Sequence, residues 1–394
     1  MKKSQRQIYS NSDGYYSLSV SNRRRIVILG KTGSGKSSLA NTIFGEELFK
    51  ISHNPNSETR ECEAETKSVN GRSITLIDTP GFFDTDRSEE ELKEEIVKCI
   101  TECAPGPHAF LIVLKVEKFT KHEQEIINTI QEYFSEEAFK YATVVFTHGE
   151  QLPEGQKIED FVSKNRLISD LVKKCGGRCH VIDNRYWKEK PKDEYRSNQF
   201  QVEELLKTID KMVTANNGSC YTNEMLQEVE GMIKQEEEKI RLLIGNMTEE
   251  EIRQTAKDRV YKVLIRLAGV GTGVFIGALL GVTVMVGVVI TALKTVSITT
   301  IVNTADTVGR AVGARDGAAG ALGAATVVTG IIASAAIGAV KGGIEGYRAA
   351  EGADTAWEAT KRAAEAVKNE AQSVYTKAKD TVDKMSEPKK SCHL

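Results

Sequence analysis

The sequence lacks a strong net charge, a paired set of cysteines and an apolar run at its N-terminus. Its 53 Lys and Arg residues nearly balance 55 Asp and Glu residues, and the net charge of −2 gives no reason to expect nucleic acid as a partner. The seven cysteines are scattered and odd in number, which indicates reduced intracellular thiols rather than a disulfide framework. Residues 1–24 are polar, so we expect a disordered N-terminal arm and no secretory signal peptide.

Residues 25–218 alternate short apolar runs with amphipathic stretches, a pattern typical of strands alternating with helices. Asn70-Gly71, in the middle of residues 64–78, predicts a two-residue turn between two antiparallel strands. Further strands are expected in a set of apolar runs that suit burial on both faces, at residues 25–29, 109–116, 141–147 and 179–183. Helices are expected at residues 121–134 and 158–175. One antiparallel hairpin in an otherwise parallel, helix-covered sheet predicts a doubly wound α/β domain.

The C-terminal part changes in composition twice. Residues 219–262 are charged and predict a helical extension, in which Thr248 to Glu251 has the spacing of a capping box. Residues 267–293 and 317–340 carry no charge, and each is long enough to cross a bilayer. We therefore expect a membrane helical hairpin over residues 263–343, followed by an amphipathic helical tail over residues 344–394.

Glycines in rows support this membrane hairpin. Four of them recur at every fourth position of the first uncharged segment, namely Gly269, Gly273, Gly277 and Gly281. Such rows let helices approach closely in lipid. The alternative is a buried hairpin in a water-soluble protein, but each glycine destabilises a helix in water by about 1 kcal/mol relative to alanine.

The most specific motif is the sequence GKTGSGKS, which follows an expected strand and precedes an expected helix. This is the pattern of a phosphate-binding P-loop, in which backbone N–H groups surround the phosphates. Lys36 is expected at the β- and γ-phosphates, and the Ser37 hydroxyl at Mg²⁺. The predicted nucleotide-binding residues of this loop are Gly30, Lys31, Thr32, Gly33, Ser34, Gly35, Lys36, Ser37 and Ser38.

The motif DTPG, which begins at Asp78, completes the expected metal and γ-phosphate site. Asp78 ends an expected strand, where its carboxylate can hold the magnesium shell, and the Gly81 N–H can reach the γ-phosphate. A threonine is needed to close over Mg²⁺. Thr59 and Thr66 are the candidates, and we prefer Thr59 because Thr66 falls in an expected strand of the hairpin.

The sequence THGE after the expected strand at 141–147 is the candidate for reading the base. A carboxylate there accepts hydrogen bonds from two donors of guanine, whereas adenine would present a lone pair. Glu150 can take this role, and His148 can lie flat on the base. Asn184, which ends the next apolar run, is the expected second contact with the base, although an ordinary loop at 147–150 is the alternative.

These motifs together resemble the GTPases of immunity-associated proteins, the GIMAP family. The resemblance rests on GKTGSGKSSLANTIFG, SETREC, LIDTPGFFDT, CAPGPHAFLIVLKVEKFT, VIDNR and the stretch at 201–226, and it covers residues 25–241. It implies a septin-like G domain that binds GTP and GDP with Mg²⁺. It also implies homo- or hetero-oligomers formed through the G domain, and attachment to a lipid bilayer through the C-terminal segments. Lys118 stands where the family often has an arginine, and it is the candidate catalytic cation across a dimer.

Slow hydrolysis is expected because Phe82 occupies the position at which fast GTPases carry a glutamine that orients water. The favoured interpretation is a GTP-binding switch or scaffold on an intracellular membrane, with the G domain facing the cytosol and hydrolysis that depends on assembly. Two alternatives stay open: an efficient GTPase enzyme, and a GTP-gated effector that disrupts membranes.

Overall fold

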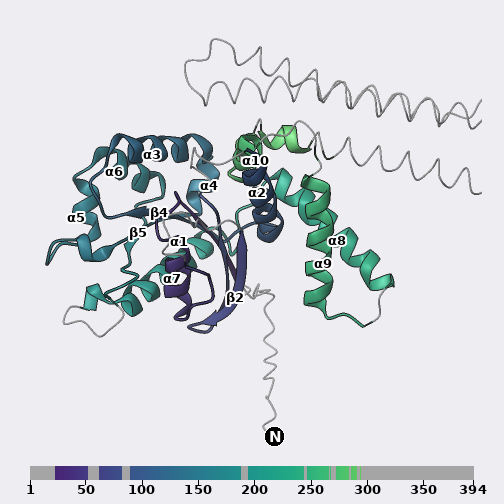
Figure 1. The fold of residues 1–394 in the computed structure, drawn as a ribbon, viewed down its shortest axis with the longest axis horizontal. Helices are drawn as coiled ribbons and strands as arrows, with labels where there is room; N and C mark the ends of the chain where they lie inside the picture. The colour runs from purple at the N-terminus through teal and green to yellow at the C-terminus, as the bar shows by residue number, and fades with distance from the viewer. Residues whose placement is uncertain are drawn as a thin grey trace, which may run out of the picture.

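The computed structural model describes residues 23–51, 62–81, 89–187, 194–243, 246–265, 267, 272–283, 285–290 and 293. A six-stranded sheet runs through its centre in the order β2-β3-β1-β4-β5-β6 (Figure 1). Its strands are β1 (Arg23–Leu29), β2 (Glu63–Val69), β3 (Arg72–Asp78), β4 (Ala109–Lys115), β5 (Ala142–Thr147) and β6 (Cys179–Val181). Only the β2–β3 pair is antiparallel among these strands. The predicted doubly wound α/β sheet with one hairpin is therefore confirmed.

Helices cover both faces of the sheet, and the strand sequences explain why. In β1, Ile26 and Ile28 pack with α1 (Lys36–Phe44) and α7 (Asn198–Ala215) on one face. The alternate residues of β1 pack on the other face against α2 (Glu89–Cys103) and α3 (Lys121–Tyr133). Because successive side chains of a strand point to opposite faces, a strand buried on both sides must be apolar at every position.

Two local predictions have clear outcomes. Asn70 and Gly71 form the predicted turn between β2 and β3, and both have positive φ angles, 48° and 77°. The single helix expected over residues 158–175 is instead two helices, α5 (Ile158–Ser163) and α6 (Arg166–Lys174). The reason is Asn165, whose side chain accepts hydrogen bonds from the backbone N–H groups at the start of α6 and so begins a new helix. A short helix, α4 (Glu136–Lys140), precedes β5.

The charged extension is a pair of antiparallel helices, α8 (Glu224–Leu243) and α9 (Glu249–Ile265), beside α2 (Figure 1). The predicted capping box is present, because Thr248 and Glu251 exchange hydrogen bonds between side chain and backbone at the start of α9. Arg253 of α9 bonds to both Glu230 and Glu237 of α8, at 2.8 and 2.9 Å. These ion pairs add to the packing of the buried apolar residues that the two helices share.

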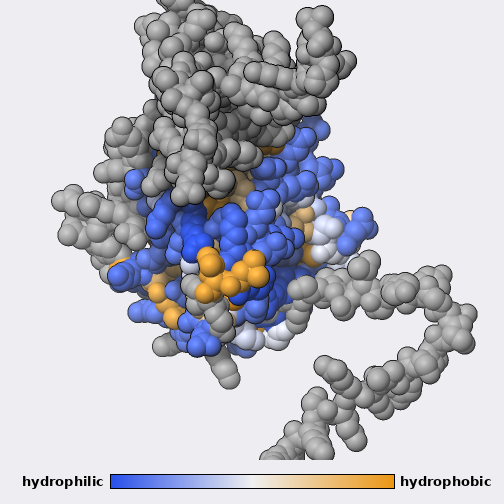
Figure 2. All heavy atoms as spheres, turned by 90° about the vertical axis from the view of Figure 1, so that its right-hand side faces the viewer, coloured by the Kyte–Doolittle hydropathy of each residue, from blue (hydrophilic) through white to orange (hydrophobic). Residues whose placement is uncertain are grey.

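The face formed by this helix pair is mostly hydrophilic but carries a compact apolar patch (Figure 2). At the end of α8, the side chains of Leu242 and Leu243 are 87% and 76% exposed. They are the most exposed large apolar residues in the described part of the chain.

The first expected membrane segment differs from its prediction. Instead of one helix over residues 267–293, the described residues contain α10 (Thr272–Leu279), eight residues long, which packs against α2. Phe275 of α10 is fully buried. The helix ends at a turn in which Gly281 has φ 90°. The prediction of a single spanning helix over residues 267–293 is therefore wrong for this part of the chain.

Two of the glycines suit the turn that ends this helix. A Cβ on Gly277 would lie 1.8 Å from the sulfur of Met285, so the missing side chain leaves room for the Met285 side chain. Gly281 adopts a left-handed conformation that side chains disfavour. In the described ranges, no helix has the length and apolar composition needed to span a bilayer. The expected segment at 317–340, the tail at 344–394 and residues 1–22 of the expected arm at 1–24 lie outside the described residues. Residues 23–24, which were expected in that arm, instead begin β1.

Candidate nucleotide-binding site

The phosphate loop connects β1 to α1, as its position between a strand and a helix predicts. Gly30 lies so close to β4 that a Cβ there would be 2.6 Å from the carbonyl oxygen of Val113. Gly35 precedes α1 with φ 89°, a conformation that favours glycine. The ammonium group of Lys36 donates to the carbonyl oxygens of Gly30 and Lys31, at 3.1 and 3.0 Å, so its side chain curls over the loop. The loop is thus closely folded around a lysine that points back across it.

A serine and an aspartate meet at the start of α1, where the sequence predicts a metal. The Ser37 hydroxyl donates to Oδ2 of Asp78 at 2.5 Å, and Asp78 is fully buried at the end of β3. The other carboxylate oxygen, Oδ1, is buried and has no hydrogen-bond partner within the described residues. Burial raises the pKa of Asp78, and the nearby Lys36 ammonium and Ser37 hydroxyl oppose this rise. Mg²⁺ takes oxygen ligands and usually keeps several ordered waters. A buried carboxylate oxygen without a partner, next to a serine hydroxyl, can bind such an ion or accept a hydrogen bond from one of its waters.

Of the two threonine candidates for closing this site, Thr66 lies within the described residues. Thr66 lies in β2, and its hydroxyl oxygen is 2.8 Å from that of Thr75 on the neighbouring strand. Its hydroxyl therefore bonds within the sheet, which favours the choice of Thr59. Thr59 itself lies outside the described residues, as does Phe82, while Gly81 is buried just after β3.

The loop is also fastened to the carboxyl ends of β5 and β6. The Thr147 hydroxyl donates to the carbonyl oxygen of Ser34 at 2.8 Å. The side-chain oxygen of Asn184 accepts from the Thr42 hydroxyl of α1 at 3.0 Å, and its amide nitrogen lies 3.5 Å from the Gly35 carbonyl oxygen. Asn184, expected at the base, thus contacts α1 and the end of the phosphate loop in this structure.

The candidate base-reading residues share a short loop after β5. His148 has φ 60° and precedes a single 3-10 turn, η1 (Gly149–Gln151). Its Nδ1 lies 3.2 Å from Oε1 of Glu150, and the two side chains are 48% and 26% exposed. Gly149 packs on the buried Trp187 ring, where a Cβ would be 2.7 Å from a ring carbon. The loop therefore presents a histidine and a carboxylate side by side at the surface.

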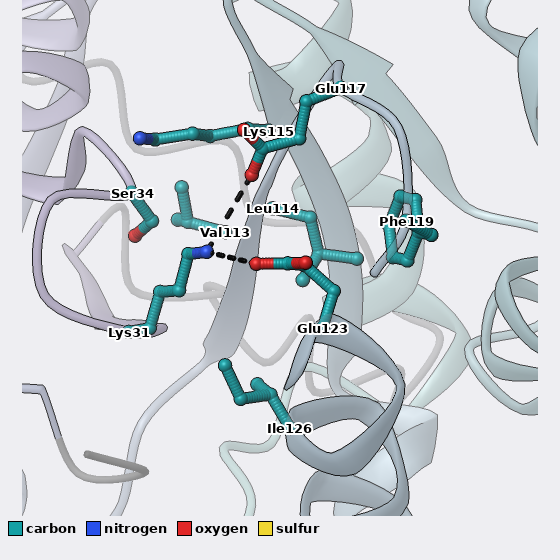
Figure 3. Close-up of a pocket in the computed structure, with 9 residues that line it drawn as sticks. All are labelled: Lys31, Ser34, Val113, Leu114, Lys115, Glu117, Phe119, Glu123 and Ile126. Atoms are coloured by element: carbon teal, nitrogen blue, oxygen red, sulfur yellow. Dashed lines mark hydrogen bonds and ion pairs between the residues drawn. The ribbon is translucent and has the colours of Figure 1, made fainter. Parts of the chain in front are cut away.

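An ion pair beside the phosphate loop was not foreseen from the sequence. Figure 3 shows the Lys31 ammonium between Glu123 and Glu117, with N–O distances of 2.5 and 3.6 Å. Although partial burial opposes it, bonding to Lys31 and Thr120 lowers the pKa of Glu123 to about 2. Lys118 is exposed in the β4–α3 loop, next to Glu117. The pair thus ties the loop that carries Lys118 to the phosphate loop.

A second unforeseen residue is Asp183, which is fully buried after β6 and accepts the Glu150 backbone N–H at 2.9 Å. Its neighbour in the sequence, Asn184, is the residue predicted to contact the base. The only local sign of Asp183 in the sequence is its position as a polar residue at the end of an apolar strand. Glu123 is marked by its capping-box spacing from Thr120.

Comparison with known proteins finds relatives that match about half of the chain. "Immune-associated nucleotide-binding protein 8" of Arabidopsis thaliana is 38% identical over 222 residues, which are 54% of this chain and 59% of that protein. "GTPase IMAP family member 8" of Homo sapiens is 32% identical over 199 residues, 50% of this chain and 29% of that protein. The chain therefore spans less than two thirds of the length of either relative.

Among solved structures, Toc33 from Arabidopsis thaliana in complex with GDP and Mg²⁺ matches 49% of this chain and 85% of its own, with 23% sequence identity and a TM-score of 0.39. The sequence relatives confirm the resemblance to immunity-associated GTPases. The model of the AIG1 family matches residues 24–240, more than half of the chain, and the protein therefore belongs to the AIG1 family.

Proposed function

We propose that this protein is a guanine-nucleotide switch that binds GTP and GDP with Mg²⁺ through the loop at residues 30–38. One observation carries the proposal: Lys36 and Ser37 lie close to the Asp78 carboxylate at one end of the sheet, and one oxygen of that carboxylate has no hydrogen-bond partner within the described residues. Bound Mg²⁺ would supply positive charge to the phosphates. Ser37 and Asp78 would hold it, and Lys36 would contact the β- and γ-phosphates.

Guanine specificity is assigned to Glu150. Its carboxylate lies at the surface beside His148, on the loop that follows β5, and its backbone N–H bonds to Asp183 after β6. A carboxylate can accept from the ring N–H and the exocyclic amine of guanine, and in Glu150 this would replace the contacts of Oε1 with His148 and Gln151. Such charge-assisted bonds contribute about 1.5–3 kcal/mol each, which is enough to select guanine over adenine.

Two substitutions test this assignment by calorimetric titration of the full chain with nucleotides. Lys36→Ala should weaken GTP, GDP and ATP alike, because it removes a contact with the phosphates. Glu150→Ala should weaken GTP much more than ATP, because only guanine offers two donors to that carboxylate. Unchanged GTP affinity in Lys36→Ala would reject the loop assignment, and unchanged affinity in Glu150→Ala would place base recognition elsewhere.

Hydrolysis is proposed to be slow in the isolated chain and to depend on self-association. Phe82 carries no group that can orient a water molecule. Lys118 is exposed on the loop that Glu117 ties to Lys31. In a dimer, its ammonium group would approach the phosphates bound by the neighbouring copy. The single-turnover rate should therefore rise with protein concentration in the wild type, and much less in Lys118→Ala. A fast rate that is independent of concentration would favour an efficient GTPase enzyme.

Membrane attachment is proposed for the glycine-rich C-terminal third, with the G domain on the cytosolic side of an intracellular membrane. The support is the uncharged segment at residues 317–340. Carbonate extraction of membranes from cells that express the full chain, compared with a chain lacking residues 317–340, tests this proposal. Release of the full chain by carbonate would contradict it.

A further inference from the structure

We propose that Asp183 is a positioning residue that sets guanine selectivity by holding the backbone of Glu150. This inference rests on the proposed guanine-binding function and adds the residue that orients its reading carboxylate. Three backbone N–H groups donate to the buried side chain of Asp183.

The carboxylate of Asp183 joins two loops that are far apart in the sequence. Its Oδ2 accepts the N–H of Glu150 at 2.9 Å, and its Oδ1 accepts the N–H groups of Arg185 and Tyr186 at 2.7 and 2.5 Å. The Gly149 N–H also donates to the carbonyl oxygen of Ile182, at 3.2 Å. Hydrogen bonds from two successive residues, Gly149 and Glu150, therefore fix the position of this loop relative to the end of β6.

Asp183 is itself held firmly in place. Its backbone N–H donates to Oδ1 of Asn198 at 3.1 Å, and its carbonyl oxygen accepts from Nδ2 of the same side chain at 2.5 Å. Asp183 is fully buried, and Asn198, the first residue of α7, is only 7% exposed. The support for Glu150 thus extends through Asp183 into a helix that packs on the sheet.

An ionised carboxylate suits this position better than an amide. It has only acceptors, and here it receives three N–H donors, which is the arrangement that stabilises its charge. Burial alone would raise the pKa of Asp183, but a side-chain contact with Glu150 and the backbone bonds from Tyr186, Arg185 and Glu150 outweigh it and lower the pKa. An asparagine in the same place would turn a donor toward an N–H group on one side. The Glu150 backbone or the turn at 185–186 would then have to move.

The consequence concerns selectivity because Glu150 must meet two donors of guanine at once. A displacement of its backbone leaves a carboxylate near the base but out of line with the ring N–H and the exocyclic amine. The phosphates are bound by a different loop and do not depend on this alignment. Loss of Asp183 should therefore reduce discrimination between bases and leave binding of the phosphates largely intact.

Inosine diphosphate provides the direct probe, since it differs from GDP only by lacking the exocyclic amine. We would measure GDP and IDP affinities by calorimetry with the full chain purified in detergent and Mg²⁺ present. In the wild type, one charge-assisted bond gives GDP a preference of about 10- to 100-fold. We expect this ratio to fall at least about tenfold in Asp183→Asn and to approach one in Glu150→Ala.

The double variant separates a positioning role from general destabilisation. If Asp183 acts through Glu150, Asp183→Asn should have no further effect on the GDP/IDP ratio in the Glu150→Ala background. Tyr195→Phe is the matched control, because it removes another side-chain acceptor of a backbone N–H, that of Ile158, at 2.9 Å. This control should keep the wild-type ratio.

The outcomes distinguish this inference from the function on which it rests. A wild type that binds IDP as well as GDP would overturn the reading of guanine by Glu150, and with it this inference. A clear wild-type preference that survives in a folded Asp183→Asn, or an equal loss of GDP and IDP, would overturn the inference alone. If Asp183→Asn does not fold, Asp183→Ser keeps a short acceptor for the 185–186 turn and removes the reach to Glu150. It should lose the preference in the same way, and a retained preference would again refute the role of Asp183.

Discussion

Replacement of Gly281 by alanine should weaken the docking of α10 on the G domain. Gly281 has φ 90°, and a side chain in this left-handed region costs about 1–2 kcal/mol. The new Cβ would also lie 2.4 Å from the Ser135 hydroxyl and 2.5 Å from the Tyr221 hydroxyl. Both neighbours have little freedom, because Ser135 caps α4 and Tyr221 is 1% exposed.

The turn at Gly281 also places the end of α10 for bonding to the G domain. The Ser135 N–H donates to the carbonyl oxygen of Leu280 at 3.0 Å. The Asn223 amide donates to the carbonyl oxygen of Ala278 at 2.8 Å. A turn that shifts to relieve the contacts at Gly281 loses these bonds as well. We therefore expect Gly281→Ala to weaken the docking of α10 by at least about 2 kcal/mol, which is a roughly 30-fold change in the opening equilibrium.

Hydrogen exchange of the full chain in detergent, read by mass spectrometry on peptides from α10, measures this opening directly. Exchange in α10 should accelerate about 30-fold in Gly281→Ala, while peptides from β4 and β5 should keep their protection. Gly231→Ala in α8 is the matched control, since a Cβ there meets nothing within 4 Å. Alanine should leave that helix unchanged or make it slightly more stable. Unchanged exchange in α10 of Gly281→Ala would refute the idea that this turn fixes the helix.

Three further predictions concern protonation, metal and ion pairing. Burial and the neighbouring Arg residues lower the pKa of His108 to about 3, so the free energy of unfolding should fall by about 2 kcal/mol from pH 7 to pH 5, as the unfolded histidine takes up a proton near pH 6.5. Urea titrations should show a smaller pH dependence in His108→Gln, and an equal one would assign the effect to another group. In Asp78→Asn, removal of Mg²⁺ should hardly change GTP affinity, whereas it should weaken the wild type at least about tenfold, and a variant as sensitive as the wild type would exclude Asp78 from the metal site. Arg253→Met should lower the free energy of unfolding by about 2 kcal/mol, because it removes the cation that Glu230 and Glu237 share and leaves them only longer contacts, with Lys234 at 4.0 Å and Arg241 at 3.8 Å. A loss below about 0.5 kcal/mol in denaturant titrations would argue against that pairing.

The sequence by itself determined the features whose causes are local. The β2–β3 hairpin follows from Asn70-Gly71, because few residue pairs adopt two successive positive φ angles. The start of α9 follows from the capping box at Thr248 and Glu251, which spans only three residues. The juxtaposition of Ser37 and Asp78 was also predictable, since parallel strands bring their carboxyl ends to one edge of the sheet.

Tertiary structure decided the features that depend on partners distant in the chain. Phe275 and its neighbours are apolar enough for lipid or for a protein core, and only the packing of α10 on α2 distinguishes the two. Asp183 looked like the polar end of a strand until the fold brought the Glu150 N–H to 2.9 Å from its carboxylate. Hydrophobic burial is non-directional and leaves many destinations open to an apolar segment. A hydrogen bond between segments 33 residues apart requires a register that only the folded sheet provides.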